Sequence, residues 1–106
     1  MPKYMFQAHY TVEGAKAMAK EGGSSRRAAI TKAAESAGSK LEGFYYAFGG
    51  VDVFAIADLP DNVTAAAFAL TVTQGGAATT NTVVLLTPEE MDKAAKKTVA
   101  YRAPGH

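Results

Sequence analysis

The stretch Leu41–Asp58, which reads LEGFYYAFGGVDVFAIAD, decides the fold of this chain. Two runs rich in aromatic and β-branched residues, Leu41–Phe48 and Val51–Ala57, flank the pair Gly49-Gly50. Such runs are typical of β-strands. A Gly-Gly pair tolerates the positive φ that a two-residue hairpin turn requires. The stretch therefore predicts a β-hairpin whose turn lies at the two glycines.

Both strands of this hairpin are apolar on both faces. In the first strand, Tyr45 points to one face, while Phe44 and Tyr46 point to the other. An antiparallel sheet in a small monomer usually leaves one face exposed to water. A chain of 106 residues has only one modest core. We therefore expect a second copy of the chain to cover the remaining face, so that the protein forms a homodimer or a higher homo-oligomer.

Helix and strand signals outside the hairpin complete an α+β pattern. The expected order is strand, helix, strand, strand, helix, strand and a terminal helix, which is the split βαβ pattern of a ferredoxin-like fold. Suitable N-caps are Thr11, then Ser24 or Ser25, then Asp61 or Asn62, and Thr87-Pro88-Glu89-Glu90 is a strong helix start. Outside the hairpin, the expected strands are Tyr4–Thr11 and Thr79–Leu86, and the expected helices lie between Thr11 and Gly22, Ser24 and Ala37, Val63 and Gln74, and Thr87 and Lys97.

We expect one ferredoxin-like domain over residues 1–97, followed by a C-terminal arm or disordered tail over residues 98–106. Right-handed crossovers predict that the first and third strands are parallel neighbours at the centre of the sheet. Helices then cover one face, with the alanine-rich second helix close to the sheet. The third helix is apolar nearly all round, which predicts cover on more than one side, and Phe68 is a candidate interface residue on it.

The composition argues against several kinds of partner and site. The net charge of +1 does not steer the protein toward nucleic acid or an anionic membrane surface. Cysteine is absent, which excludes disulfides and thiolate metal sites. No run approaches the roughly 18 apolar residues of a membrane span, and no signal-peptide pattern precedes the first strand. No residues are spaced like a metal motif. We therefore expect a soluble cytoplasmic protein without a metal or cofactor.

Three stretches of the chain resemble the GYD-domain family: MPKYMFQAHYT, GSSRRAAITKAAESAGSKLEGFYYAFGGVDVFAIADLPD and LLTPEEM. The resemblance covers roughly residues 1–97. It implies a small ferredoxin-like protein related to the dimeric α/β barrels. The motif that names the family is present here as Gly50, Val51 and Asp52, with valine in the position of the tyrosine. A role that needs a phenol at that position is therefore not carried over to this chain.

His9 is the principal candidate for catalysis. It lies in mid-strand, where it and Gln7 are expected to face the chamber enclosed by a dimer. Asp58, near the end of the expected parallel neighbour, would lie beside His9, and Glu42 would lie close to Asp58. A histidine–carboxylate pair in an apolar chamber can act as a general base, with Tyr46 as a hydrogen-bond donor. The alternative is a histidine that is hydrogen-bonded at the sheet end or at an interface.

The aromatic residues of the hairpin are candidate walls of a ligand pocket. Phe44, Tyr46 and Phe54 are expected to share a face, where they either line a pocket for a planar ligand or pack in a core or an interface. Asp52 follows the expected turn directly. It either bonds the turn amides or binds a ligand at the end of the sheet opposite His9.

Arg26 and Arg27 form a minor candidate site for an anion. They follow Gly22-Gly23-Ser24-Ser25 at the start of a helix, where backbone amides, hydroxyls and the positive end of the helix can hold an anion. The lysine and glycine spacing of a phosphate loop are absent. The alternative is a solvated helix start.

Two functions are compatible with these features. The first is a homo-oligomeric module that binds a small apolar or anionic molecule or has an accessory role. It is favoured by the uncharged stretch Asn62–Pro88 and by the small number of catalytic residue types. The second is a cofactor-independent oxygenase- or isomerase-like enzyme of the dimeric α/β-barrel type, which would act on a planar apolar substrate. This second hypothesis rests in part on analogy between folds.

Overall fold

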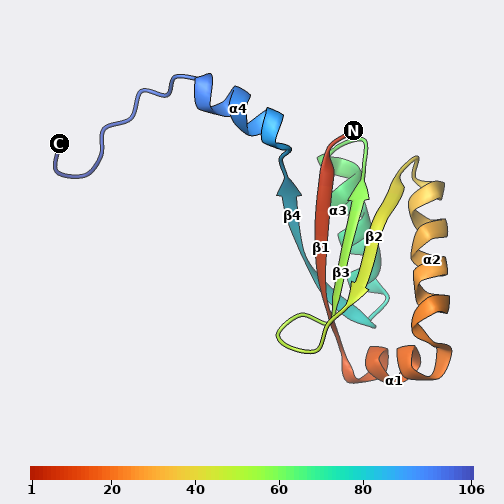
Figure 1. Cartoon of the computed structure of the whole chain (residues 1–106). Coiled ribbons are helices and arrows are strands. Elements are labelled where there is room, and N and C mark those ends of the chain that lie inside the picture. Colours follow the sequence, from red (N-terminus) through yellow and green to blue (C-terminus); the bar gives the residue numbers. More distant parts are fainter.

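Four strands form one antiparallel sheet in the computed structural model, which describes all 106 residues (Figure 1). The two central strands, β1 and β3, are flanked by β2 and β4 at the edges, in the order β2-β3-β1-β4. The elements in chain order are β1 (Lys3–Tyr10), α1 (Val12–Glu21), α2 (Gly23–Ser36), β2 (Lys40–Tyr46), β3 (Val53–Asp58), α3 (Asn62–Gln74), β4 (Ala78–Leu85) and α4 (Pro88–Lys96). The α+β class and the ferredoxin-like element order are as predicted.

The predicted parallel pairing of the first and third strands is wrong. β1 and β3 are neighbours, but they run antiparallel, with Lys3 opposite Asp58 and Ala8 opposite Val53. The handedness rule applies to strands that a crossover joins directly, and α1 and α2 join β1 to β2. β3 then folds back from β2 and lies between β1 and β2, so it is antiparallel to both of these strands.

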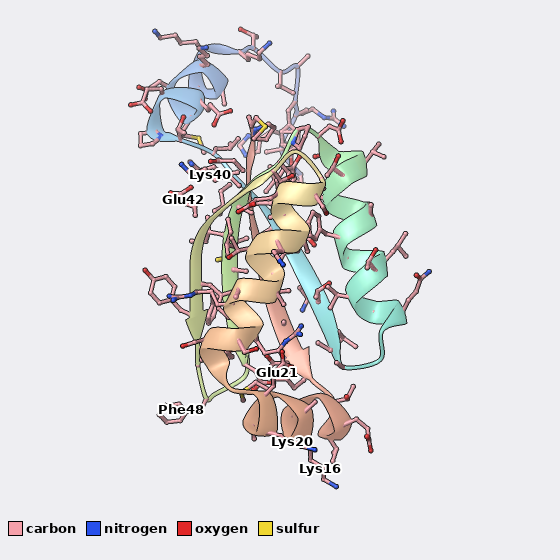
Figure 2. All side chains as sticks on the ribbon, turned by 90° about the vertical axis from the view of Figure 1, so that its right-hand side faces the viewer. Lys16, Lys20, Glu21, Lys40, Glu42 and Phe48 are labelled. Atoms are coloured by element: carbon pink, nitrogen blue, oxygen red, sulfur yellow. The ribbon has the colours of Figure 1, made fainter.

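The connection between β2 and β3 is longer than the predicted two-residue turn. β2 ends at Tyr46 and β3 begins at Val53. Neither Gly49 nor Gly50 has a positive φ, so the glycines do not form the expected turn. Phe48 projects from this loop into solvent, on the side of the sheet away from α2 and α3 (Figure 2).

Local caps define the helices, largely as predicted. The Thr11 hydroxyl accepts a hydrogen bond from the Gly14 amide at the start of α1. Asp61 caps α3 by accepting from the Thr64 amide at 2.8 Å. Thr87 and Glu90 form a reciprocal capping box at the start of α4. The exception is α2, whose N-cap is Gly22 with a φ of 100° instead of a serine.

Three helices cover one face of the sheet and leave the other face open. Figure 2 shows α2 and α3 over the same face, with α1 across one end. The fully packed core under them is small, because only 10 of the 106 residues are buried. Its main cluster joins Tyr4 and Leu59 to Ala57 and Ala65. On the open face, the strand register places Met5 beside Ile56 and Val83.

The C-terminal part of the chain leaves the body of the domain. Helix α4 and the residues after it extend beyond the end of β4 (Figure 1). No residue of α4 is buried, and its apolar residue Met91 is exposed. This helix is therefore stabilised locally, by its capping box and by acidic residues in its first turn and lysines in its last. No helix of the chain has the length and apolarity needed to cross a membrane.

Candidate functional site

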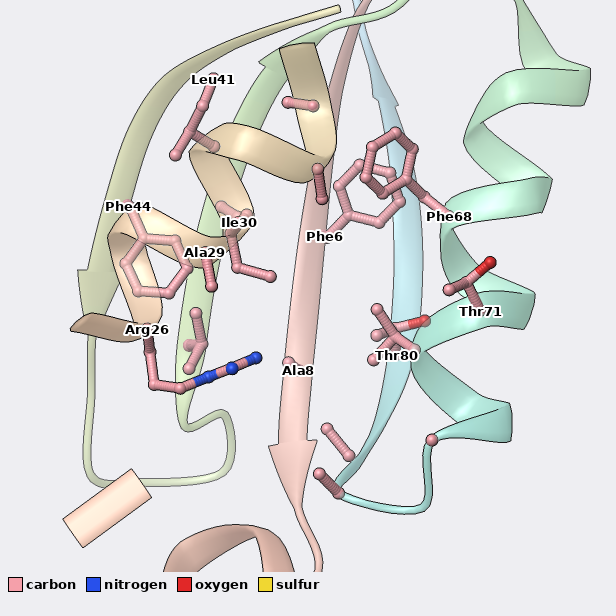
Figure 3. Close-up of a pocket in the computed structure, with 18 of the residues that line it drawn as sticks. Phe6, Ala8, Arg26, Ala29, Ile30, Leu41, Phe44, Phe68, Thr71 and Thr80 are labelled. Carbon is pink, nitrogen blue, oxygen red and sulfur yellow. The ribbon is translucent and has the colours of Figure 1, made fainter. Parts of the chain in front are cut away.

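A cavity of about 430 Å³ lies between the sheet and the helices that cover it (Figure 3). Its wall is formed by all three covering helices and by the helix-facing residues of the four strands. Of its 26 lining residues, 19 are hydrophobic, so the space favours an apolar occupant over water.

Small side chains create this space. The face of α2 that points to the sheet carries Ala29, Ala33 and Ala34, and the strands opposite contribute Ala8 and Ala55. Because alanines on both layers reach only a short distance, the layers leave a gap in the middle. The alanine-rich helix packs against the sheet at Ala34, which is buried, but leaves the cavity beside Ala29 and Ala33.

Large apolar side chains close the upper part of the cavity in the view of Figure 3. Phe6 of β1 and Phe68 of α3 have ring centroids 6.2 Å apart. On the other side, Phe44 of β2 lies near Ile30 of α2. Phe68 therefore packs against the sheet of its own chain, and its prediction as an interface residue is wrong. The exposed stripe of α3 instead carries Val63 and Leu70.

One cation lines the cavity. The Arg26 side chain leaves the first turn of α2 and extends toward Ala8 (Figure 3). Its Nη1 lies 3.7 Å from Oε1 of Glu21, and the two side chains are 36% and 41% exposed. At that distance and exposure the pair is weak. The same Glu21 oxygen also accepts a hydrogen bond from the Ser25 hydroxyl at 3.1 Å.

Tyr10 supplies a neutral phenol beside Arg26. Burial, together with the adjacent Tyr46 phenol and the Asp52 carboxylate, raises the pKa of Tyr10 to about 12, against the opposing charge of Arg26. The Tyr10 hydroxyl therefore keeps its proton at neutral pH and can donate a hydrogen bond. Tyr46 is oriented by its own hydroxyl, which donates to the Gly23 carbonyl at 3.1 Å.

Thr80 of β4 is the one buried polar side chain without a hydrogen-bond partner. Its hydroxyl oxygen lies in the cavity wall, inaccessible to solvent. An unsatisfied buried hydroxyl is unfavourable by about 1–3 kcal/mol, and such groups are rare in native proteins. Because a water-sized probe does not reach this oxygen, it is not exposed to the open space of the cavity, although other atoms of Thr80 line it.

The predicted catalytic pair does not form. His9 lies opposite Thr79, whereas Asp58 lies opposite Lys3 at the other end of β1. The misplacement follows from the strand direction, because a parallel β3 would have brought Asp58 toward His9. Asp58 and Glu42 are indeed close to each other, but both hold the Lys3 ammonium, and these bonds raise the pKa of Lys3.

Phe54 and Gln7 lie outside the cavity. The register pairs Tyr46 with Val53 and Tyr45 with Phe54. Residues that pair directly share a face of the sheet, so Phe54 lies on the open face and does not join Phe44 and Tyr46. Gln7 pairs with Phe54 and therefore also belongs to the open face.

Asp52 lies at the same end of the sheet as His9, not at the opposite end. Its carboxylate accepts a hydrogen bond from the Tyr10 amide at 2.8 Å, and its own amide donates to the Ala8 carbonyl at 2.9 Å. Asp52 therefore ties the β2–β3 loop to the end of β1 instead of bonding turn amides. The same contacts place its charge near the Tyr10 phenol.

Of the other predicted residues, Phe44 and Arg26 line the cavity, and Arg27 does not. Tyr10 and Thr80 were not predicted as site residues. Tyr10 alternates with Phe6 and Ala8 along β1, so period-two alternation would have placed it on the helix-facing side. Nothing in the sequence distinguishes Thr80 from the other threonines of β4. No group of three or more His, Asp or Glu side chains is arranged to hold a metal ion.

The fold and the cavity define a two-layer, ferredoxin-like α+β domain with an apolar space of ligand size between its layers. Residues 4–95 match the sequence model of the GYD domain, and the chain therefore belongs to the GYD-domain family. A comparison with curated proteins and one with solved structures found no match.

Proposed function

We propose that this protein is a homo-oligomeric small-molecule binding module that holds an apolar compound between its sheet and its helices. The observation that carries the proposal is the cavity of about 430 Å³ with its largely hydrophobic wall. Ligand pockets typically have volumes of roughly 300–1,000 Å³, with mostly apolar walls and a few polar groups. The presence of Arg26, Glu21 and Tyr10 in a largely apolar wall fits that description.

The size of the cavity argues against a simple packing defect. At about 24 cal/mol per Å³, a dry void of 430 Å³ would be unfavourable by about 10 kcal/mol. That figure is comparable with the whole free energy of unfolding of a small domain, about 5–15 kcal/mol. The cavity is partly open, so water can enter it, and a compound that replaces this water with apolar contacts gains about 25 cal/mol per Å² of apolar surface buried.

The chemistry of the wall favours binding over catalysis. Glu21 is the only carboxylate that lines the cavity, and no histidine does. The His9–Asp58 pair on which the enzyme hypothesis depended is separated by the length of β1. A general base must reach its substrate within hydrogen-bond distance, and His9 belongs to the other face of the sheet.

The open face supports assembly with a second copy. It carries large apolar residues on neighbouring strands, including Met5, Ile56 and Phe54. A face of this kind on a soluble domain usually marks an interface. Light scattering at micromolar concentration is expected to give at least twice the chain mass of 11.0 kDa.

The binding proposal can be tested with N-phenyl-1-naphthylamine, an uncharged dye that fluoresces in apolar surroundings. The wild-type protein is expected to enhance its fluorescence. Ala8→Leu, which places a larger side chain on the cavity floor, is expected to weaken the enhancement at least tenfold. Ala66→Leu is the matched control, because Ala66 is exposed on α3 and does not line the cavity. Equal enhancement by wild type and Ala8→Leu, or none by either, would refute the proposal.

A further inference from the structure

The polar groups of the cavity are gathered around one positively charged side chain. Arg26 is the only lysine or arginine among the lining residues, and its guanidinium reaches over Ala8 (Figure 3). Tyr10, on the same side of the cavity, adds a neutral hydroxyl. The upper part, around Phe6 and Phe68, contains no charged group. The cavity therefore has one charged end and one apolar end.

The guanidinium is not saturated by its own chain. Its nearest carboxylate oxygen, on Glu21, is 3.7 Å away, well beyond the roughly 2.7–2.9 Å of a charge-assisted hydrogen bond. That oxygen is already shared with Ser25. A guanidinium carries five N–H donors in a planar fork that matches a carboxylate. The donors of Arg26 are thus open to an anion that enters from the cavity.

The charge count indicates how much anionic charge the site can hold. Arg26 and Glu21 are the charged residues of the lining, so an anion at Arg26 meets one positive charge that a carboxylate 3.7 Å away already partly balances. A phosphate monoester brings almost two negative charges at neutral pH, and no second cation lines the cavity. A carboxylate matches both the charge and the planar geometry of the guanidinium.

Building on the proposed function, we infer that the ligand is an amphipathic monocarboxylate, with its carboxylate held by Arg26 and Tyr10 and its apolar body lying between Phe6, Phe44 and Phe68. The apolar body is a medium aliphatic chain or an aromatic ring system.

The test measures displacement of N-phenyl-1-naphthylamine by three eight-carbon compounds with different head groups: octanoate, 1-octanol and octylamine. Charge-assisted hydrogen bonds contribute roughly 1.5–3 kcal/mol, which corresponds to about 10- to 100-fold in affinity. Octanoate is therefore expected to displace the dye at a concentration at least tenfold lower than 1-octanol. Octylamine is expected to be the weakest, because its cation faces Arg26.

Matched variants test whether the preference for octanoate over 1-octanol depends on the Arg26 side chain. Arg26→Gln is expected to reduce the affinity for octanoate about tenfold and to leave that for 1-octanol unchanged. Arg27→Gln is the control, because Arg27 follows in the same helix turn but lies outside the cavity. Tyr10→Phe is expected to reduce octanoate affinity a few-fold, and it provides a second readout if Arg26→Gln does not fold.

The outcomes separate this inference from the proposed function. If the dye binds but octanoate and 1-octanol displace it equally, or if Arg26→Gln weakens both alike, the assignment of a carboxylate is wrong and the apolar site stands. If the dye does not bind the wild-type protein, both proposals fail.

Discussion

The two faces of the sheet are both apolar, yet they differ in the size of their side chains. The face under the helices carries alanines at its centre, including Ala8, Ala55 and Ala57. The open face carries Met5, Phe54 and Ile56 at neighbouring positions. Small residues under a helical layer leave room inside the chain, whereas large residues without a cover favour contact with another molecule. Hydrophobicity alone does not distinguish a binding cavity from an interface, but side-chain volume does.

The largest effect is expected from a charge on the open face. Ile56→Asp would bury an unpaired carboxylate in the proposed interface, which is unfavourable by roughly 3–5 kcal/mol. The assembly is therefore expected to weaken at least a hundredfold and to yield a particle of 11.0 kDa in sedimentation experiments. Val63→Asp is the control, because Val63 is exposed at the start of α3. An unchanged mass for Ile56→Asp would place the interface elsewhere.

Removing an aromatic side chain from the helix layer tests whether the Phe6–Phe68 end of the cavity stabilises the domain. Phe68→Ala removes the ring that packs beside Phe6 and is expected to lower the free energy of unfolding by about 3 kcal/mol. Leu70→Ala, on the exposed side of the same helix, is expected to change it by less than about 0.5 kcal/mol. Urea denaturation measures the free energy of unfolding of both variants. Similar losses for the two variants would mean that α3 is covered on both sides.

A titration tests the half-buried Tyr10 phenol at the charged end of the cavity. The pKa of Tyr10 is raised from 10.0 to about 12, so the folded protein holds this proton more tightly than the unfolded chain. Its contribution to stability is complete below pH 10.0 and is lost as the pH rises to about 12. Absorbance titration is expected to show a phenol that ionises near pH 12 in the wild-type protein, and Tyr10→Phe should remove this ionisation. If an ionisation near pH 12 persists in that variant, it does not belong to Tyr10.

The smallest effect concerns the unpartnered hydroxyl. Thr80→Val keeps the shape of the side chain and removes the unsatisfied oxygen, so it is expected to raise the free energy of unfolding by about 1 kcal/mol. Thr79→Val is the control, because Thr79 lies on the open face beside His9. The midpoint of thermal unfolding is measured for Thr80→Val and Thr79→Val, and only Thr80→Val is expected to raise it. A loss of stability in Thr80→Val would indicate that the hydroxyl has a partner in solution.

Local signals predicted the elements of this fold well. Thr11 and Thr87 cap their helices as predicted, and Asp61, one of the two candidates for α3, caps that helix. Such signals succeed because a cap involves residues only three positions apart. The loop after β2 was mispredicted for the complementary reason. Its conformation depends on Asp52, which bonds β1 more than forty residues earlier in the chain.

The candidate site was only partly predictable. Arg26 and Phe44 were chosen for their residue types, and both line the cavity. The pairing of His9 with Asp58 failed because it depended on strand direction, which alternation along a single strand does not reveal. Thr80 had no signal at all, because its significance is the absence of a partner in three dimensions.

The amino-acid sequence by itself determined the types and order of the helices and strands, the apolar character of both sheet faces and the membership of the family. These depend on residues close together in the chain, through caps, turns and period-two alternation. Only the tertiary structure decided which face the helices cover and where the cavity lies. The cavity arises because the alanines of α2 meet those of β1 and β3 across the layers, and the volume between them depends on both layers at once.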